Sequence, residues 1–135
     1  MKVLIPSEGS TLESPVAKRF GRATWYLIVD VETETVNPVQ NLRKEDHNDI
    51  VPKAATEGVV TVITGNIGPR SYELISTHNL QVAHCRDMSG HEALERLKRG
   101  ELKILDAPTV KRNVEEHELL RQGRREQFEK GKRFA

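Results

Sequence analysis

The chain is poor in cysteine and in aromatic residues, and each shortage restricts the kinds of site or core that the protein can form. Cys85 is its single cysteine, which excludes an intramolecular disulfide framework and a zinc site built from paired cysteines. The amino terminus has one charged side chain and few apolar residues before Pro6, far too few for a signal peptide or a membrane span. We therefore expect a protein of the reducing cytoplasm that does not contact a membrane.

Net charge is also nearly absent. The 21 lysines and arginines oppose 20 aspartates and glutamates, for a formal charge of +1, so no global field attracts nucleic acid or a membrane surface. Aromatic residues make up 4% of the chain within a hydrophobic share of 36%, so aliphatic side chains must fill most of the core. A length of 135 residues is enough to bury such a core, and one main domain is expected.

Short apolar runs separated by turn residues predict alternating strands and helices. The β-branched run 59–64 predicts a buried strand, and Gly58 ends the helix before it. Pro69 suits the first turn of a second helix, and Ser89, with Glu92 three residues later, suits the N-cap of a third. The expected strands are 2–5, 24–31, 36–42, 59–64 and 80–83, and the expected helices are 49–57, one starting at 69, and one between 89 and 100.

This order of elements predicts the fold class. The second and third strands are close enough in sequence to form an antiparallel hairpin, while helices connect the later strands and favour parallel pairing. The prediction is a three-layer α/β domain with a five-stranded mixed sheet, because connections of this kind place helices on both faces.

Two glycine-containing loops carry the main functional signal. The first contains Arg19-Phe20-Gly21-Arg22-Ala23 ahead of a strand-like run, and the second, residues 64–70, reads Thr-Gly-Asn-Ile-Gly-Pro-Arg. With these motifs the chain resembles the dinitrogenase iron-molybdenum cofactor binding and biosynthesis family, whose small domains bind or carry this cofactor and related metalloclusters. The resemblance covers about residues 1–105 and implies a ribonuclease H-like fold with the first strand at the centre of the sheet.

The implied fold also suggests where a ligand binds. The first and fourth strands become neighbours whose connections leave in opposite directions, which favours the crevice beyond their carboxyl ends. Glycines there permit close approach of a ligand, and amides at the start of the following helix hold an anion. The alternative is a tight strand-to-helix turn in which Gly68 relieves crowding and Pro69 sets the helix. The cofactor-binding residues implied by the resemblance are Arg19, Phe20, Gly21, Arg22, Gly65, Asn66, Ile67 and Gly68.

Arg19 departs from the family pattern, because many relatives have histidine immediately before Phe-Gly-Arg-Ala. A guanidinium stays protonated and does not coordinate a metal. The arginine therefore indicates pairing with an anionic cluster or a phosphate rather than ligation. The alternative for this segment is an ordinary loop with solvated arginines. Phe20 is expected to anchor this loop in the core.

Soft metal ligands are scarce in the chain. Cys85 lies just beyond the last expected strand, where a thiolate would suit copper or an iron-sulfur assembly. The alternative for Cys85 is a small buried hydrophobic residue. His47, which precedes the first expected helix, is the second candidate metal ligand, with a surface histidine as the alternative.

The sequence does not support catalysis. A two-metal nuclease needs clustered carboxylates, whereas the first strand and its exit contain only Glu8, and Asp30 and Asp87 have no convincing third partner. No nucleophile motif is present either. We therefore predict that the protein is not an enzyme.

The composition changes at residue 106, and we expect residues 106–135 to form a charged, helical C-terminal extension to a domain of residues 1–105. Within residues 121–133, 6 basic residues oppose 2 acidic ones, which favours contact with an acidic partner, nucleic acid or a neighbouring subunit. The alternative is a solvated helix whose charges follow the helix dipole.

Two functions follow from these observations. The resemblance implies a non-catalytic carrier of an anionic iron-molybdenum-sulfur or related metal-sulfur cluster, with a cluster donor or acceptor protein as partner and no nucleic acid. The alternative is a cofactor-free binding or regulatory module of the same fold that uses its basic tail for protein or nucleic-acid contact.

Overall fold

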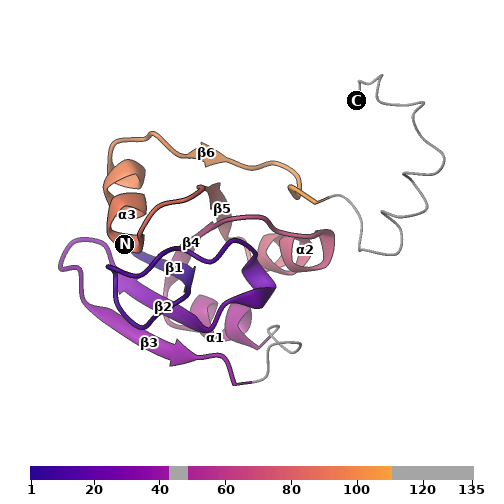
Figure 1. The fold of residues 1–135 in the computed structure, drawn as a ribbon. Helices are drawn as coiled ribbons and strands as arrows, with labels where there is room; N and C mark the ends of the chain where they lie inside the picture. Colours follow the sequence, from indigo (N-terminus) through magenta and orange to yellow (C-terminus); the bar gives the residue numbers. More distant parts are fainter. Residues whose placement is uncertain (43–48, 111–135) are drawn as a thin grey trace.

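A mixed sheet runs through the centre of the computed structural model, which describes residues 1–42 and 49–110 (Figure 1). The described residues form six strands in the order β3-β2-β1-β4-β5-β6. The strands are β1 (Lys2–Ser7), β2 (Trp25–Asp30), β3 (Val36–Gln40), β4 (Val59–Thr64), β5 (Gln81–His84) and β6 (Lys103–Ile104). The helices are α1 (Ile50–Thr56), α2 (Pro69–Thr77) and α3 (Gly90–Lys98), with a short 3-10 turn at Phe20–Arg22.

The predicted mixed α/β sheet is confirmed. β1 lies at the centre, antiparallel to β2 and parallel to β4, with the β2–β3 hairpin on one side and the parallel strand β5 on the other. The predicted number of five strands is wrong, because β6 adds an antiparallel edge strand through the pairs Ala83–Ile104 and His84–Lys103. Two exposed residues show no periodicity, so the sequence carried no signal for this strand.

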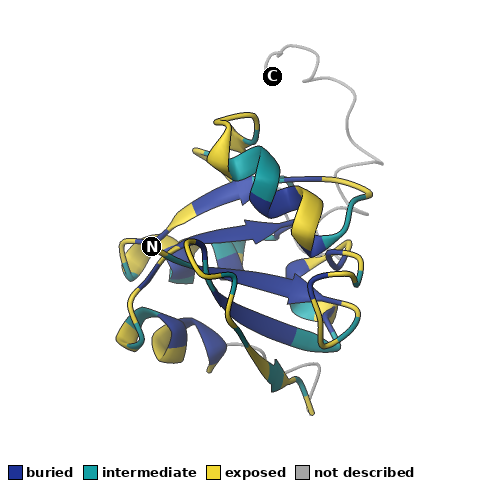
Figure 2. Cartoon of the chain, turned by 90° about the vertical axis from the view of Figure 1, so that its left-hand side faces the viewer, coloured by how far each residue is buried: buried dark blue, intermediate teal, exposed yellow. Residues whose placement is uncertain are grey.

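Two apolar clusters cover the two faces of the sheet. Side chains of α1 and α2, including Val51 and Ile75, pack with Leu4 and Val62 on one face. On the other face, Ala93 and Leu94 of α3 pack against alternate residues of the strands, together with the loop that follows β1. The strands are therefore buried from both sides, and exposed residues concentrate on the outer helix surfaces and on β3 (Figure 2).

The first strand continues past the proline that was expected to end it. Pro6 pairs with Tyr26 of β2, and its carbonyl accepts a hydrogen bond from the Ala17 N–H at 2.9 Å. The last pair between β1 and β4 is Leu4–Val62. Pro6 therefore lies beyond the parallel pairing, where its missing N–H breaks no bond to β4.

The predicted helix ends agree with the structure to within about two residues. Ser89 is the N-cap of α3, and its hydroxyl accepts the Glu92 N–H at 3.1 Å. Pro69 occupies the first turn of α2, as expected. Gly58 follows α1 with a φ of +95°, a backbone conformation that glycine adopts without a Cβ penalty.

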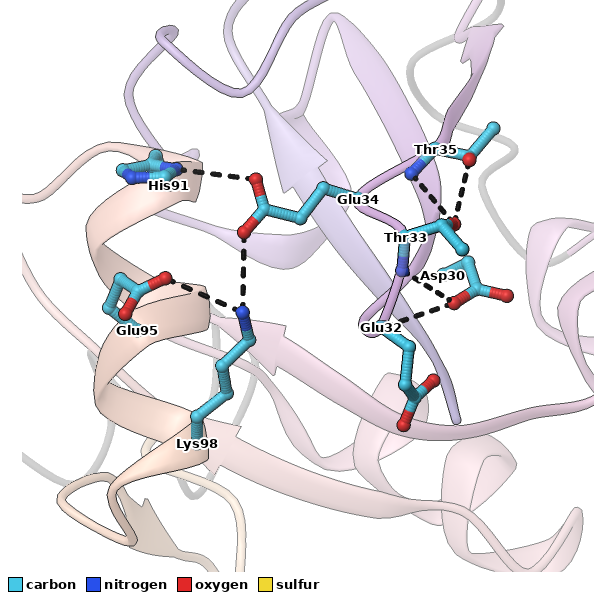
Figure 3. Close-up of polar contacts among 8 residues, drawn as sticks. All are labelled: Asp30, Glu32, Thr33, Glu34, Thr35, His91, Glu95 and Lys98. Atoms are coloured by element: carbon cyan, nitrogen blue, oxygen red, sulfur yellow. Dashed lines mark hydrogen bonds and ion pairs between the residues drawn. The ribbon is translucent and has the colours of Figure 1, made fainter.

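The β2–β3 turn is fastened to α3 (Figure 3). The Asp30 carboxylate accepts the Thr33 N–H at 3.2 Å, which helps to hold Glu34 at a φ of +59°. The Glu34 carboxylate then lies 3.2 Å from Lys98 Nζ and 3.9 Å from His91 Nδ1. The hairpin and α3 are thus joined by the Glu34–Lys98 ion pair and by a His91–Glu34 contact that is an ion pair only when the imidazole is protonated.

The C-terminal part of the chain is described as far as Val110. Residues 108–110 are not helical, and the helix expected farther along falls outside the described residues, as does His47. Within residues 1–42 and 49–110, no helix is both long enough and apolar enough to cross a membrane.

Candidate ligand-binding site

The two glycine loops meet at the carboxyl ends of β1 and β4. The Phe20 N–H donates to Asn66 O at 2.9 Å, and the Asn66 N–H donates to Lys18 O at 2.7 Å. Arg19 and Asn66 form a parallel bridge between the loops. The structure therefore joins the two sequence segments that carried the resemblance, through backbone hydrogen bonds rather than side chains.

The connection that leaves β1 begins on the face opposite to the one that α2 covers, and only its later residues, Ala17 and Phe20, reach the α2 face. Leu12 and Val16, in the loop after β1, belong to the apolar cluster around α3. Ile75 of α2, which follows β4, belongs to the cluster on the opposite face. This reversal opens a crevice at the strand ends, the place where open α/β sheets bind ligands.

Gly65 is required by the close approach of the loops. A Cβ at this position would lie 2.6 Å from Lys18 O and 2.7 Å from Ala17 O, well inside van der Waals contact. Gly68 is different: its φ is −85°, and no described atom lies within 4 Å of the position of a Cβ. Gly65 therefore allows the two loops to lie in close contact, while Gly68 leaves open space at the start of α2.

Phe20 anchors its loop in the core, as expected. Phe20 and Ile67 are each 1% exposed and belong to the same apolar cluster. The Phe20 and Tyr26 ring centroids are 5.5 Å apart, and the Tyr26 hydroxyl donates to Phe20 O at 2.8 Å. Arg19 and Arg22, in contrast, are exposed. The loop is therefore anchored in the core through Phe20 and presents two positively charged side chains at the surface.

A cavity of about 330 Å³ lies between the loop after β1 and the loops after β4 and β5. Of the residues expected at the site, it contains Gly65, Asn66 and Cys85, whereas Arg19–Arg22, Ile67 and Gly68 lie outside its lining. Its walls are formed by Glu8, Pro15, Val16, Ala17, Lys18, Gly65, Asn66, Cys85, Arg86 and Asp87.

Sequence reasoning missed the two basic residues of this cavity, Lys18 and Arg86, and named Glu8 and Asp87 only as carboxylates too few for a nuclease. Lys18 and Arg86 oppose Glu8 and Asp87 in its walls, and all four are exposed. Lys18 directly precedes Arg19, and Arg86 directly follows Cys85; both neighbours were predicted site residues. For Arg86 the available signal was its position just after β5, because the carboxyl ends of parallel strands meet at one edge of the sheet, whereas Lys18 lies within the long connection after β1 and gave no such signal.

The Cys85 thiol is buried in this wall. Cys85 is 4% exposed, and burial, with a smaller effect of Glu92, raises the pKa of its thiol to about 11. The side chain is therefore a neutral thiol near pH 7 rather than a thiolate. In the described part of the chain, no group of three His, Cys, Asp or Glu side chains is arranged to hold a metal ion. Among the residues that line the cavity, Cys85 is the one soft donor.

Two of the amides expected to hold an anion are already engaged within the chain. The Asn66 N–H donates to Lys18 O, and the Ile67 N–H donates to Thr109 Oγ1 at 2.8 Å. Gly68 offers no side-chain cap to α2. An anion that approaches this loop would therefore meet the start of α2 and the side chains around it, rather than the Asn66 and Ile67 amides.

A polar pair lies beside the site at the ends of β4 and β5. Thr64 and His84 are register partners, and among the described residues neither Thr64 Oγ1 nor His84 Nε2 has a hydrogen-bond partner. Desolvation, followed by the nearby charges of Arg86 and Lys103, lowers the pKa of His84. His84 is therefore held neutral in the folded protein at pH 7.

These features define a small α/β binding domain whose site lies where the sheet connections diverge. The model of the dinitrogenase iron-molybdenum cofactor family matches residues 1–100. This chain belongs to that family. No curated protein matches it significantly.

Solved structures support the same fold. The apo form of the orange protein from Desulfovibrio gigas is 23% identical, with a TM-score of 0.73 over 80% of this chain and 95% of that one. A putative NifB protein from Thermotoga is 29% identical, with a TM-score of 0.70 over 80% and 96%. A putative dinitrogenase from Methanocaldococcus jannaschii is 20% identical, with a TM-score of 0.62 over 80% and 97%. The chain thus spans nearly the full length of each.

Proposed function

We propose that this chain binds and carries an anionic iron-molybdenum-sulfur cluster, or a related metal-sulfur cluster, as an accessory of metallocofactor assembly. The observation that carries the proposal is the cavity at the diverging ends of β1 and β4, inside the region that matches the family. The cluster is cargo, so the partner is a protein that donates or accepts it. The same strand arrangement supports the ribonuclease H-like classification as part of this proposal.

The proposed role is binding without catalysis. The cavity has two carboxylates, Glu8 and Asp87, whereas two-metal hydrolysis relies on a larger set of converging ligands. Lys18 and Arg86 supply positive charge, and exposed Arg19 lies beside Lys18 in the chain. Such side chains pair with the outer sulfur atoms of an anionic cluster without changing its bonds.

Charge-neutralising variants in the cavity test this proposal. Lys18→Gln and Arg86→Gln should each weaken uptake of an iron-molybdenum-sulfur cluster roughly two- to fivefold at low salt, and Glu8→Gln should strengthen it. Uptake is measured by anaerobic titration of the apo protein, followed by its charge-transfer absorption and by metal analysis. A copper-molybdenum-sulfur cluster serves as the second probe.

Lys53→Gln is the matched control, since Lys53 is an exposed lysine of α1 paired with Glu57 and is not part of the cavity. If all four variants bind with equal affinity, the cavity is not the site of an anion. If the wild-type chain stays colourless and binds neither cluster, the carrier function itself is wrong.

Two observations favour the cofactor-free alternative. Arg19 stands where many relatives have histidine, and Cys85 is a buried thiol with a raised pKa, so the chain offers little direct ligation. In that case the basic tail, outside the described residues, would make the functional contact. Deletion after Gly123 should then weaken capture of a protein or nucleic-acid partner in a salt-dependent manner, while unchanged capture would exclude the tail.

A further inference from the structure

Residues 105–110 form a strap that crosses from the edge of the sheet to the loop between β4 and α2. The strap follows β6 and passes toward α2 (Figure 1). It begins at Leu105, whose N–H donates to Val82 O at 2.8 Å and whose carbonyl accepts the Tyr72 hydroxyl at 3.2 Å. Leu105 also packs against the apolar cluster on the α2 face. The strap is therefore attached to both β5 and α2 before it reaches the loop.

The far end of the strap binds a single residue of that loop. Thr109 Oγ1 accepts the Ile67 N–H at 2.8 Å and lies 3.3 Å from Ile67 O, to which it donates. The Thr109 and Val110 N–H groups both donate to Ile67 O at 3.1 Å. Both backbone polar groups of Ile67, a residue 1% exposed, are thus satisfied by residues about forty positions away in the chain.

The loop is consequently held from two sides. Asn66 is bonded to Lys18 and Phe20 of the first glycine loop, and Ile67, the next residue, is bonded to the strap. Asn66 also lines the cavity. A loop fixed in this way loses little conformational entropy when a ligand binds, because the chain has already ordered it.

We propose that Thr109 is a positioning residue for the ligand-binding loop and that the strap is a working part of the site. Thr109 does not line the cavity. It acts through Ile67, by holding the β4–α2 loop in the conformation that places Asn66 at the cavity wall. The inference rests on the proposed function, and it extends beyond the family match, which ends at residue 100.

The test uses three full-length variants. Thr109→Val keeps the shape of the side chain and removes its hydroxyl, and Thr109→Ser keeps the hydroxyl. Thr77→Val is the matched control, because the Thr77 hydroxyl donates to Glu73 O at the exposed far end of α2. Thr109→Val should bind the iron-molybdenum-sulfur cluster roughly tenfold more weakly than the wild type, while Thr109→Ser and Thr77→Val stay close to it.

Amide hydrogen exchange provides a readout that does not depend on the cluster. In Thr109→Val the Ile67 amide should exchange faster at a temperature where the variant is fully folded, with no such change in Thr77→Val. If the wild type binds the cluster and Thr109→Val binds it equally well, the positioning role is wrong and the carrier function stands. If the wild type binds no cluster, the carrier function fails, and an unchanged Ile67 exchange rate would show that the strap does not fix the loop either.

Discussion

Gly65 and Gly68 are three positions apart in one loop, and the structure gives them opposite tolerance to a side chain. A Cβ at Gly65 meets two carbonyl oxygens at 2.6 and 2.7 Å, while a Cβ at Gly68 meets no described atom. Gly65→Ala should therefore lower the free energy of unfolding by roughly 1–3 kcal/mol. Gly68→Ala should cost less than about 1 kcal/mol, the scale of a helix N-cap preference.

Chemical denaturation of both variants measures this difference. Equal stability of Gly65→Ala and Gly68→Ala would mean that the two loops separate easily and that their contact is not tight. The steric alternative for this motif was wrong about the glycine that relieves crowding: it named Gly68, whereas the structure shows the close contact at Gly65.

Cys85 should be a slow nucleophile. Its pKa of about 11, compared with an ordinary value of 9.0, reduces the thiolate fraction at pH 8 about 100-fold. Alkylation by iodoacetamide in the native protein should be slower by at least this factor than in the protein unfolded by urea. Mass spectrometry of quenched samples gives both rates, and a native rate within threefold of the unfolded one would contradict the burial.

Sequence motifs predicted the positions of some individual residues of the site and missed others. The fold implied by the resemblance placed both glycine loops at one site, and the structure joins them by backbone hydrogen bonds. Burial of Cys85 was one of its two predicted alternatives and is confirmed, and this burial, with a smaller effect of Glu92 on α3, raises the pKa of the thiol. Lys18 and Arg86 were missed because an isolated cation has no pattern until the fold places it beside a cavity.

At the scale of elements, β5 carries a histidine that links stability to pH. Desolvation, with the charges of Arg86 and Lys103, lowers the pKa of His84 from its ordinary 6.5. Between the folded and unfolded pKa values the unfolded chain binds more protons than the native one. Native stability should therefore fall as pH drops below about 6.5 and level off below the folded pKa.

The His84→Gln variant tests this linkage, because glutamine does not titrate. Urea denaturation at pH 7.5 and pH 5.0 should show a smaller loss of stability on acidification for His84→Gln than for the wild type. His91→Gln is the comparison for an exposed histidine, and because it removes the 3.9 Å contact with Glu34, its effect on the pH dependence is measured alongside that of His84→Gln. Equal losses in wild type and His84→Gln would mean that other groups set the pH dependence.

The sequence predicted some strands better than others, and the length and the residue types of each strand explain the difference. β4 was predicted at its observed bounds because six β-branched or apolar residues follow a helix-ending glycine. β1 was predicted too short because Pro6 resembles a strand end until its place beyond the β1–β4 pairing is known. β6 has two exposed residues, and only its contact with β5 defines it.

At the scale of the whole molecule, the order of elements was sufficient to predict three layers, because a hairpin and helical crossovers restrict the topology. The strap could not be predicted in this way. Its bonds to Ile67 join residues about forty positions apart, and no local pattern reports such a contact. Residues 106–110 contact the domain in the structure, so we propose that the domain extends to Val110 rather than to residue 105.

Two truncated chains test where the domain ends. A chain ending at Val110 keeps β6 and every strap contact described above, so its unfolding midpoint should stay close to that of the full chain. A chain ending at Gly100 loses the β6 pairing with β5 and leaves Ile67 without its strap partners. Its free energy of unfolding should fall by roughly 2–5 kcal/mol, and the open edge of β5 should promote self-association. Thermal unfolding and light scattering measure both effects, and equal stability of the two chains would show that β6 and the strap are not part of the folded domain.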